Sequence, residues 1–116
     1  MNNRQYWIYV PLTKEDQEKL YYAIDYNEVR DKSKYLLMTE DEMNYLWNKG
    51  LFHLINNVAN VIIDEYEEEV IDNVEDMKKV LEAINRHDEF NDEYSTQIKK
   101  LFQEAIERET EINFAF

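Results

Sequence analysis

Apolar residues recur along most of this chain at intervals of three or four positions, which is the period of an α-helix. The pattern is clearest in residues 74–84 and 94–106, where polar and charged residues occupy most intervening positions. The apolar positions are Val74, Met77, Leu81 and Ile84 in the first stretch and Tyr94, Ile98, Leu101, Phe102, Ala105 and Ile106 in the second. Each stretch therefore predicts an amphipathic helix with one buried face.

Capping signals predict where two further helices begin. Thr39 and Glu42 have the T-x-x-E spacing of a capping box, in which each side chain binds the backbone of the other residue. Gly50 stands where the C-terminus of that helix favours a residue with positive φ. Thr13 and Asp16 approximate the same box, so we expect another helix to start at Thr13.

The stretch that follows Gly50 has more than one interpretation. The positions with helical spacing are Leu51, Leu54, Ile55, Val58 and Ile62, which predict a central buried helix. Because β-branched residues dominate 58–63, a strand there is the alternative. Tyr66 and Val70 continue the spacing and would carry the helix through an acidic run, whereas Asp72 and Glu75 resemble the N-cap of a new helix.

Strands are predicted mainly at the two ends of the chain. Residues 6–12 are aromatic and β-branched, which predicts a strand. Because Pro11 lacks an N–H, this strand should either end at Pro11 or lie at a sheet edge. A second short strand is expected at 35–38, after a polar connection over 25–34. Apolar residues alternate at 112, 114 and 116, so we expect this terminal segment to pair with the strand at Tyr6.

These elements predict an α+β fold that is dominated by helices. One domain spans residues 1–116, with a small antiparallel sheet of two or three strands formed largely by the N- and C-terminal segments. The sequence has one Gly and one Pro, which disfavours an all-β fold built on tight turns.

Composition adds a strong charge to this picture. The formal net charge is -13, yet 44% of the residues are hydrophobic and 14% aromatic, so we expect a folded protein with an acidic surface. Cysteine is absent, which excludes disulfides and thiolate metal sites. No basic-then-apolar leader is visible, and no apolar run approaches the roughly 20 residues that span a bilayer. We expect a cytoplasmic protein that does not bind membranes.

The charge is concentrated between Lys49 and Lys78, where eight carboxylates occur without a basic residue. Further acidic groups lie at 15–18 and 40–42. Such a run is compatible with a solvated surface, with a contact surface for a basic protein, or with a metal site. A calcium loop usually has a glycine at its sharp turn, and the acidic clusters here lack one. We therefore predict no metal and no cofactor.

Catalytic motifs are absent from the sequence. Neither Ser33 nor Ser95 lies in a G-x-S-x-G elbow, and no glycine series forms a phosphate loop. His53 and His87 do not belong to a recognisable set of catalytic residues. The low pI also argues against direct binding of nucleic acid. The sequence thus predicts a binding protein and not an enzyme.

The leading hypothesis is a small acidic protein that inhibits or neutralises a basic partner, a nuclease or a toxin, by masking its functional surface. Bacterial toxin-immunity proteins and phage anti-nuclease inhibitors have the same general character, although no family motif is matched. DNA mimicry, with carboxylates in place of phosphates, is a close variant. The predicted contact residues are Asp64, Glu65, Tyr66, Glu67, Glu68, Glu69 and Asp72, with Tyr66 as the aromatic anchor and as a residue expected to be partly exposed.

The alternative is a self-associating structural or regulatory domain without catalytic activity. In that case an apolar homodimer interface would form from Trp7, Trp47, Phe52, Phe114 and Phe116. The acidic residues would then serve solubility alone. The protein is accordingly expected to be a monomer under the first hypothesis and a homodimer under the second.

Overall fold

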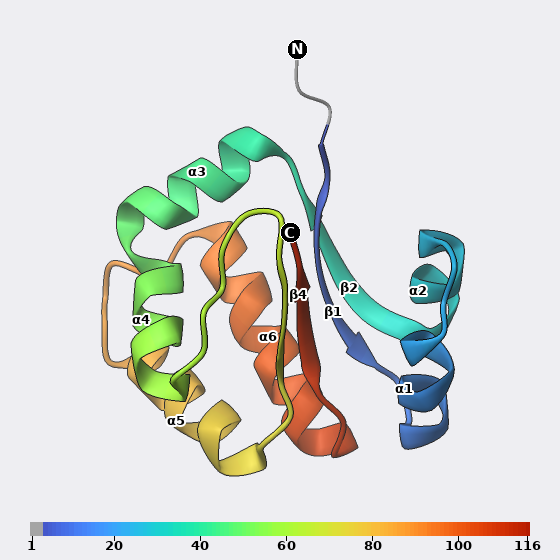
Figure 1. Ribbon diagram of the computed structural model, residues 1–116. Coiled ribbons are helices and arrows are strands. Elements are labelled where there is room, and N and C mark those ends of the chain that lie inside the picture. The colour runs from blue at the N-terminus through green and yellow to red at the C-terminus, as the bar shows by residue number, and fades with distance from the viewer. Residues whose placement is uncertain (1–3) are drawn as a thin grey trace.

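The structure, a computed structural model, describes residues 4–116. In this range six helices pack against a four-stranded antiparallel sheet with the strand order β2-β1-β4-β3 (Figure 1). The strands are β1 (Tyr6–Pro11), β2 (Ser33–Met38), β3 (Glu68–Ile71) and β4 (Ile112–Ala115). The helices are α1 (Lys14–Tyr21), α2 (Tyr26–Lys32), α3 (Glu40–Lys49), α4 (Leu51–Ala59), α5 (Val74–Asn85) and α6 (Glu93–Arg108). The predicted α+β class is confirmed, but the sheet has four strands because the acidic segment contributes β3.

The two ends of the chain meet in the middle of the sheet. β1 pairs with β4, so that Trp7 lies opposite Ala115 and Tyr9 opposite Asn113. This confirms the predicted pairing of the terminal segments. β1 also pairs with β2 along its whole length, from Tyr6 opposite Met38 to Pro11 opposite Ser33. Pro11 stands at the last position of its strand, where a missing N–H is tolerated.

Successive side chains of a strand point to opposite faces, and the two faces of this sheet are covered differently. Ile8 and Phe114 face the main core, which they share with apolar residues of α3, α4, α5 and α6. On the outer face, Trp7 packs with Leu20 of α1 and Val29 of α2 in a second, smaller core. Figure 1 shows α1 and α2 on one side of the sheet and the other four helices on the opposite side.

The predicted helix limits around α3 are confirmed. The Thr39 hydroxyl accepts a hydrogen bond from the Glu42 N–H at 3.3 Å, and the Glu42 carboxylate accepts one from the Thr39 N–H at 2.8 Å. This backbone hydrogen bond, together with the Tyr94 hydroxyl, lowers the pKa of Glu42. Gly50 ends the helix with a φ of 88°, which glycine adopts without a steric penalty.

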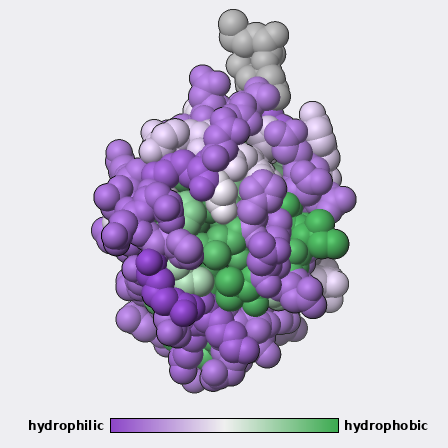
Figure 2. Space-filling model, turned by 90° about the vertical axis from the view of Figure 1, so that its left-hand side faces the viewer, coloured by the Kyte–Doolittle hydropathy of each residue, from purple (hydrophilic) through white to green (hydrophobic). Residues whose placement is uncertain are grey.

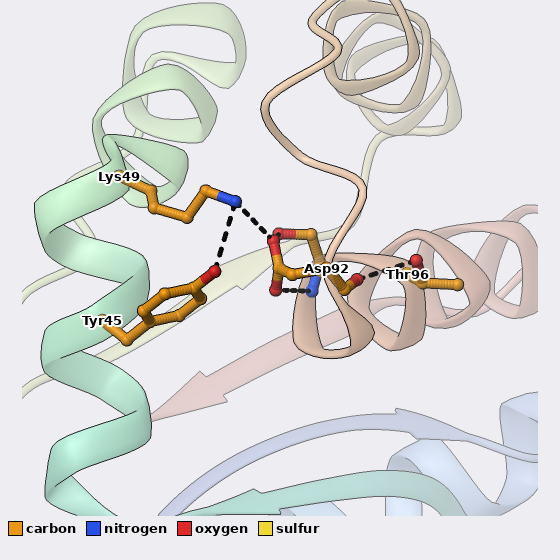
Figure 3. A network of polar contacts seen from close by, with 5 residues as sticks. Tyr45, Lys49, Asp92 and Thr96 are labelled. Carbon is orange, nitrogen blue, oxygen red and sulfur yellow. Dashed lines mark hydrogen bonds and ion pairs between the residues drawn. The ribbon is translucent and has the colours of Figure 1, made fainter.

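A polar network joins the end of α3 to the start of α6 (Figure 3). The Lys49 ammonium lies 2.9 Å from the Asp92 carboxylate and 3.4 Å from the Tyr45 hydroxyl. Asp92 caps α6, because its carboxylate accepts hydrogen bonds from the N–H and the hydroxyl of Ser95. The Thr96 hydroxyl donates to the Asp92 carbonyl at 2.8 Å. One acidic side chain therefore fixes the position of two helices.

The predictions for the stretch after Gly50 are only partly correct. α4 forms as expected but ends at Ala59, where Asn60 adopts a left-handed conformation with a φ of 55°. The Asn56 side chain then binds both the N–H and the carbonyl of Ile63, which holds the chain in a loop. The strand at 58–63 and the helix through the acidic run are both wrong. The following helix is capped by Asn73, whose side chain accepts from the Asp76 N–H, and not by Asp72.

Two further predictions need correction. The polar connection over 25–34 contains α2, which Asp25 caps and from which Val29 alone is buried. Most residues proposed for a homodimer interface lie inside the protein instead. Trp7, Phe52, Phe114 and Phe116 are at most 5% exposed, and Trp47 is partly buried against the core. Four of the five residues are therefore unavailable for a contact surface.

Candidate partner-binding surface

The β3 strand divides the predicted contact residues between two faces of the sheet. Glu68 faces outward with Val70, whereas Glu69 lies on the side of the buried Ile71. The Glu69 carboxylate accepts a hydrogen bond from the Ile62 N–H at 3.3 Å and so supports the preceding loop. A strand that alternates in this way does not present all its carboxylates in one direction.

The remaining predicted residues lie in the turn that leads into β3. This turn is tied to the end of the chain, because the Tyr66 N–H donates to the Phe116 carbonyl at 3.1 Å. The Phe116 N–H in turn donates to the Glu67 carbonyl at 3.2 Å. Asp64 accepts a hydrogen bond from the Glu65 N–H at 2.8 Å. The turn thus places exposed carboxylates beside a well-anchored aromatic residue.

Tyr66 is 78% exposed, which confirms the prediction that it is partly exposed. The Arg4 guanidinium lies over its ring at 3.8 Å from the ring centroid. It also lies 5.2 Å from the ring of Tyr6. Cations are attracted to the faces of aromatic rings, so this part of the surface already holds one arginine of the chain itself.

A groove of about 970 Å³ lies between α1 and the outer face of β3 and β4. Next to the groove, the outer face of the sheet is covered by the smaller core of Trp7, Leu20 and Val29. Its lining consists of Tyr9, Lys14, Gln17, Glu18, Leu20, Tyr21, Tyr22, Glu68, Val70, Asp72, Glu111 and Asn113. A second hollow of about 400 Å³ lies against the turn, and Glu68 lines both. The outer face is therefore hollowed along β3.

The groove has a negative electrostatic character. Its lining holds four carboxylates against the one lysine, Lys14. Burial raises the pKa of the Glu111 carboxyl, the neighbouring Asp72 adds to the shift, and the side chain of Asn113 opposes it. Burial, together with Glu68 and Glu111, also raises the pKa of Tyr9 to about 12. Both raised pKa values show that a further negative charge in the groove is unfavourable.

Within residues 4–116, no three histidine or carboxylate side chains lie close enough together to hold a metal ion. None of the helices in this range is both long and apolar enough to cross a membrane. What the surface does present is a combination of carboxylates, tyrosines and one buried amide.

Comparisons with known proteins bear on the fold. Among solved structures, the chain is similar to Neisseria DNA mimic protein DMP12, with a TM-score of 0.74. The chain shares the fold of a DNA mimic protein. The similarity covers 97% of this chain and 100% of the other, and 18% of the residues are identical, a level that establishes the fold alone. No family model matches the sequence, and no curated protein is significantly similar to it.

The sequence indicated only part of this surface. Asp72 and Glu68 were among the predicted contact residues, and Glu18 belongs to an acidic group noted from the sequence. Glu111 was not predicted, because it precedes β4 and reaches Asp72 only through the pairing of β3 with β4. Tyr21 and Tyr22 were also missed. Their position at the end of an amphipathic helix gives no signal that they stay outside the core.

Proposed function

We propose that this protein is an acidic binding protein that occupies the DNA-binding surface of a basic protein, with carboxylates in place of phosphates. The observation that carries the proposal is the hollowed acidic outer face of the sheet, in a fold shared with a DNA mimic protein. A nuclease or a DNA-binding toxin is the partner class that fits best, since such proteins must carry Lys and Arg to hold phosphates.

Electrostatics supports this function in two ways. A formal net charge of -13 repels nucleic acid and accelerates encounter with cationic surfaces. Interfacial charge affects association rate and specificity more than total affinity, so the binding should depend strongly on salt. The protein would compete with DNA by occupying the partner and without touching DNA itself.

The contact surface that we propose follows the predicted residues, with one change of role. Asp64, Glu65, Tyr66, Glu67, Glu68 and Asp72 contact the partner, at the turn and along the outer side of β3. The Glu69 carboxylate accepts a hydrogen bond from the Ile62 N–H and so holds the loop before β3. Its charge adds to the negative electrostatic potential of the surface. Exposed carboxylates at the edge of a sheet also discourage pairing with other strands, which keeps this edge free for a specific partner.

Charge reversal tests this function. The variant Glu67→Lys/Glu68→Lys changes two exposed residues of the surface, and Glu82→Lys/Asp88→Lys changes two exposed residues in and after α5 by the same charge. Extract from the host, freed of nucleic acid, is passed over each immobilised protein and eluted with duplex DNA. We expect wild type and the α5 control to retain DNA-binding proteins that the duplex releases, and the β3 variant to retain far less.

The purified partner then gives a quantitative result. The association rate constant of the β3 variant should fall about tenfold, with a weaker dependence on salt, because steering depends on local charge. If the association rate constant falls equally in the two variants, the net charge alone determines the rate and the β3 surface has no special role. Retained proteins that duplex DNA fails to release would contradict the mimicry.

A second candidate function is self-association, through a different surface from the one predicted. Ile62 is 70% exposed, and Leu54, Val58 and Val61 are only partly buried beside the core. Figure 2 looks onto the side of α3, α4 and α5 and shows hydrophobic residues gathered among polar ones. Exposed apolar patches of this kind are common where proteins associate.

Light scattering coupled to size-exclusion chromatography tests the second candidate. If this patch forms a dimer, Ile62→Ser should convert dimer to monomer, whereas Ile24→Ser should leave the dimer intact. Ile24 is the matched control because it is 95% exposed and lies on the other side of the sheet, after α1. A wild-type protein that is monomeric at high concentration would exclude this function.

A further inference from the structure

We propose that the groove between α1 and the outer face of β3 and β4 binds an extended, arginine-bearing segment of the basic partner. The inference rests on the proposed function and deepens it, because it assigns part of the binding to a shaped site in addition to a charged surface. The volume of about 970 Å³ suits a short peptide segment, since ligand pockets usually enclose several hundred Å³.

Charge complementarity indicates a cation as the occupant. Glu18 reaches the groove from α1, Glu68 from β3, and Asp72 and Glu111 from the chain beside β3 and β4. The lining has one basic residue, Lys14, and its side chain is exposed to solvent. The carboxylates of the groove are therefore available to a cation from outside. Carboxylates on the α1 side and on the β3–β4 side of the groove can accept charge-assisted hydrogen bonds from a guanidinium.

Tyrosine rings supply the second element of the site. Tyr21 and Tyr22 are 82% and 76% exposed, although large aromatic side chains are normally buried when a core is available. Together with the partly buried Tyr9 they line the groove beside the carboxylates. Arginine stacks on aromatic faces better than lysine does, because its guanidinium is planar and weakly hydrated.

Asn113 adds a buried amide to the lining of the groove. This residue is only 8% exposed. Its side chain interacts with the Glu111 carboxylate and opposes the rise in the pKa of that group. A segment that binds between the carboxylates would also change the surroundings of this amide, so Asn113 reports binding at the site.

The chain itself contains an example of the proposed contact. Arg4 lies over the ring of Tyr66 in the adjoining hollow, whose lining also includes Glu67 and Glu68. The chain thus already places one arginine beside tyrosine and glutamate residues on this face. Since Glu68 belongs to both hollows, a partner segment in the groove would continue the same pattern along β3.

Nuclear magnetic resonance tests the proposal with defined peptides. The probe is a blocked Gly-Arg-Gly-Arg-Gly peptide, and the control is its citrulline twin, which has the same shape without the charge. We expect the arginine peptide to shift the side-chain amide signals of Asn113 and the signals of Tyr21 and Tyr22, with saturation. The citrulline peptide should leave them unchanged. Shifts spread evenly over all acidic surfaces would overturn the proposal.

Variants separate the groove from general charge. Asp72→Asn/Glu111→Gln should weaken binding of the arginine peptide about fivefold or more, whereas Glu82→Gln/Asp88→Asn removes the same charge elsewhere and should have little effect. Tyr21→Ser/Tyr22→Ser changes exposed residues and provides a second variant if the first one fails to fold. Equal affinities for the groove variants and the control would exclude the site.

The two proposals fail in different ways. If the host extract yields a partner that duplex DNA releases but the arginine peptide leaves Asn113 unaffected, the groove assignment is wrong and the function stands. If the peptide binds in the groove but no retained protein is released by DNA, the proposed function is wrong.

Discussion

At the scale of single residues, Asp92 shows how one carboxylate positions two helices. It accepts hydrogen bonds from Ser95 at the start of α6 and from the Lys49 ammonium at the end of α3. Burial alone would raise the pKa of Asp92, but these hydrogen bonds outweigh it and the pKa is lowered. The pKa of Lys49 is raised by the same contact. Folding therefore favours the charged form of both groups.

This linkage predicts how the variant Asp92→Asn behaves with pH. Asparagine still caps the helix but loses the ion pair, so at neutral pH we expect a loss on the order of 1 kcal/mol in the free energy of unfolding. Because the folded-state pKa of Asp92 is depressed, its contribution is present above the unfolded pKa of about 3.9. The contribution is lost as the pH falls through the folded pKa.

Urea unfolding at about pH 7 and about pH 3 measures this effect. The difference between wild type and Asp92→Asn should be largest at the higher pH and shrink at the lower one. Asp88→Asn, an exposed neighbour, is the control and should change stability little at either pH. A difference that grows as the pH falls would contradict the role assigned to Asp92.

At the scale of secondary-structure elements, the sequence correctly predicted the helices whose signals lie within one segment. The capping box of α3 and the apolar stripes of α5 and α6 are complete within each segment, and all three helices form. α2 has one buried residue in seven, too few for a periodic pattern to be visible in the sequence.

The acidic run shows where local reasoning fails. Tyr66 and Val70 continue a helical spacing, yet the left-handed Asn60 ends α4 and β4 then recruits Glu68–Ile71 as an edge strand. The pairing partner lies more than 40 residues away in the sequence, at Ile112–Ala115. Strand formation depends on such packing more than on intrinsic preference, so no local pattern could predict β3. The groove was missed for the same reason, since its walls come from distant segments.

At the scale of the whole molecule, the excess of acidic groups opposes the compact state. Within residues 4–116, lysine or arginine forms three ion pairs with carboxylates, and one of them, Lys19–Glu15, is largely exposed. Exposed pairs contribute little to stability, so attraction between charges offsets only part of the repulsion from a net charge of -13. The two hydrophobic cores on either side of the sheet must supply the remaining stability.

This balance predicts that salt stabilises the protein. Raising the ionic strength from about 0.01 M to about 0.1 M shortens the Debye length from about 30 Å to about 10 Å, which is less than the width of the molecule. Long-range repulsion is then screened more than the short ion pairs are. The Tm measured by calorimetry should therefore rise by several degrees, on the order of 1 kcal/mol of stability.

The charge-reversal variants provide the comparison that decides the cause. Glu67→Lys/Glu68→Lys and Glu82→Lys/Asp88→Lys each replace two negative charges by two positive ones, which brings the formal net charge from -13 to -9. If global repulsion is responsible, both variants should show a smaller rise of Tm with salt than wild type. If only the β3 variant does, the repulsion is local to the proposed binding surface. A Tm that falls with salt in wild type would show that ion pairs outweigh repulsion.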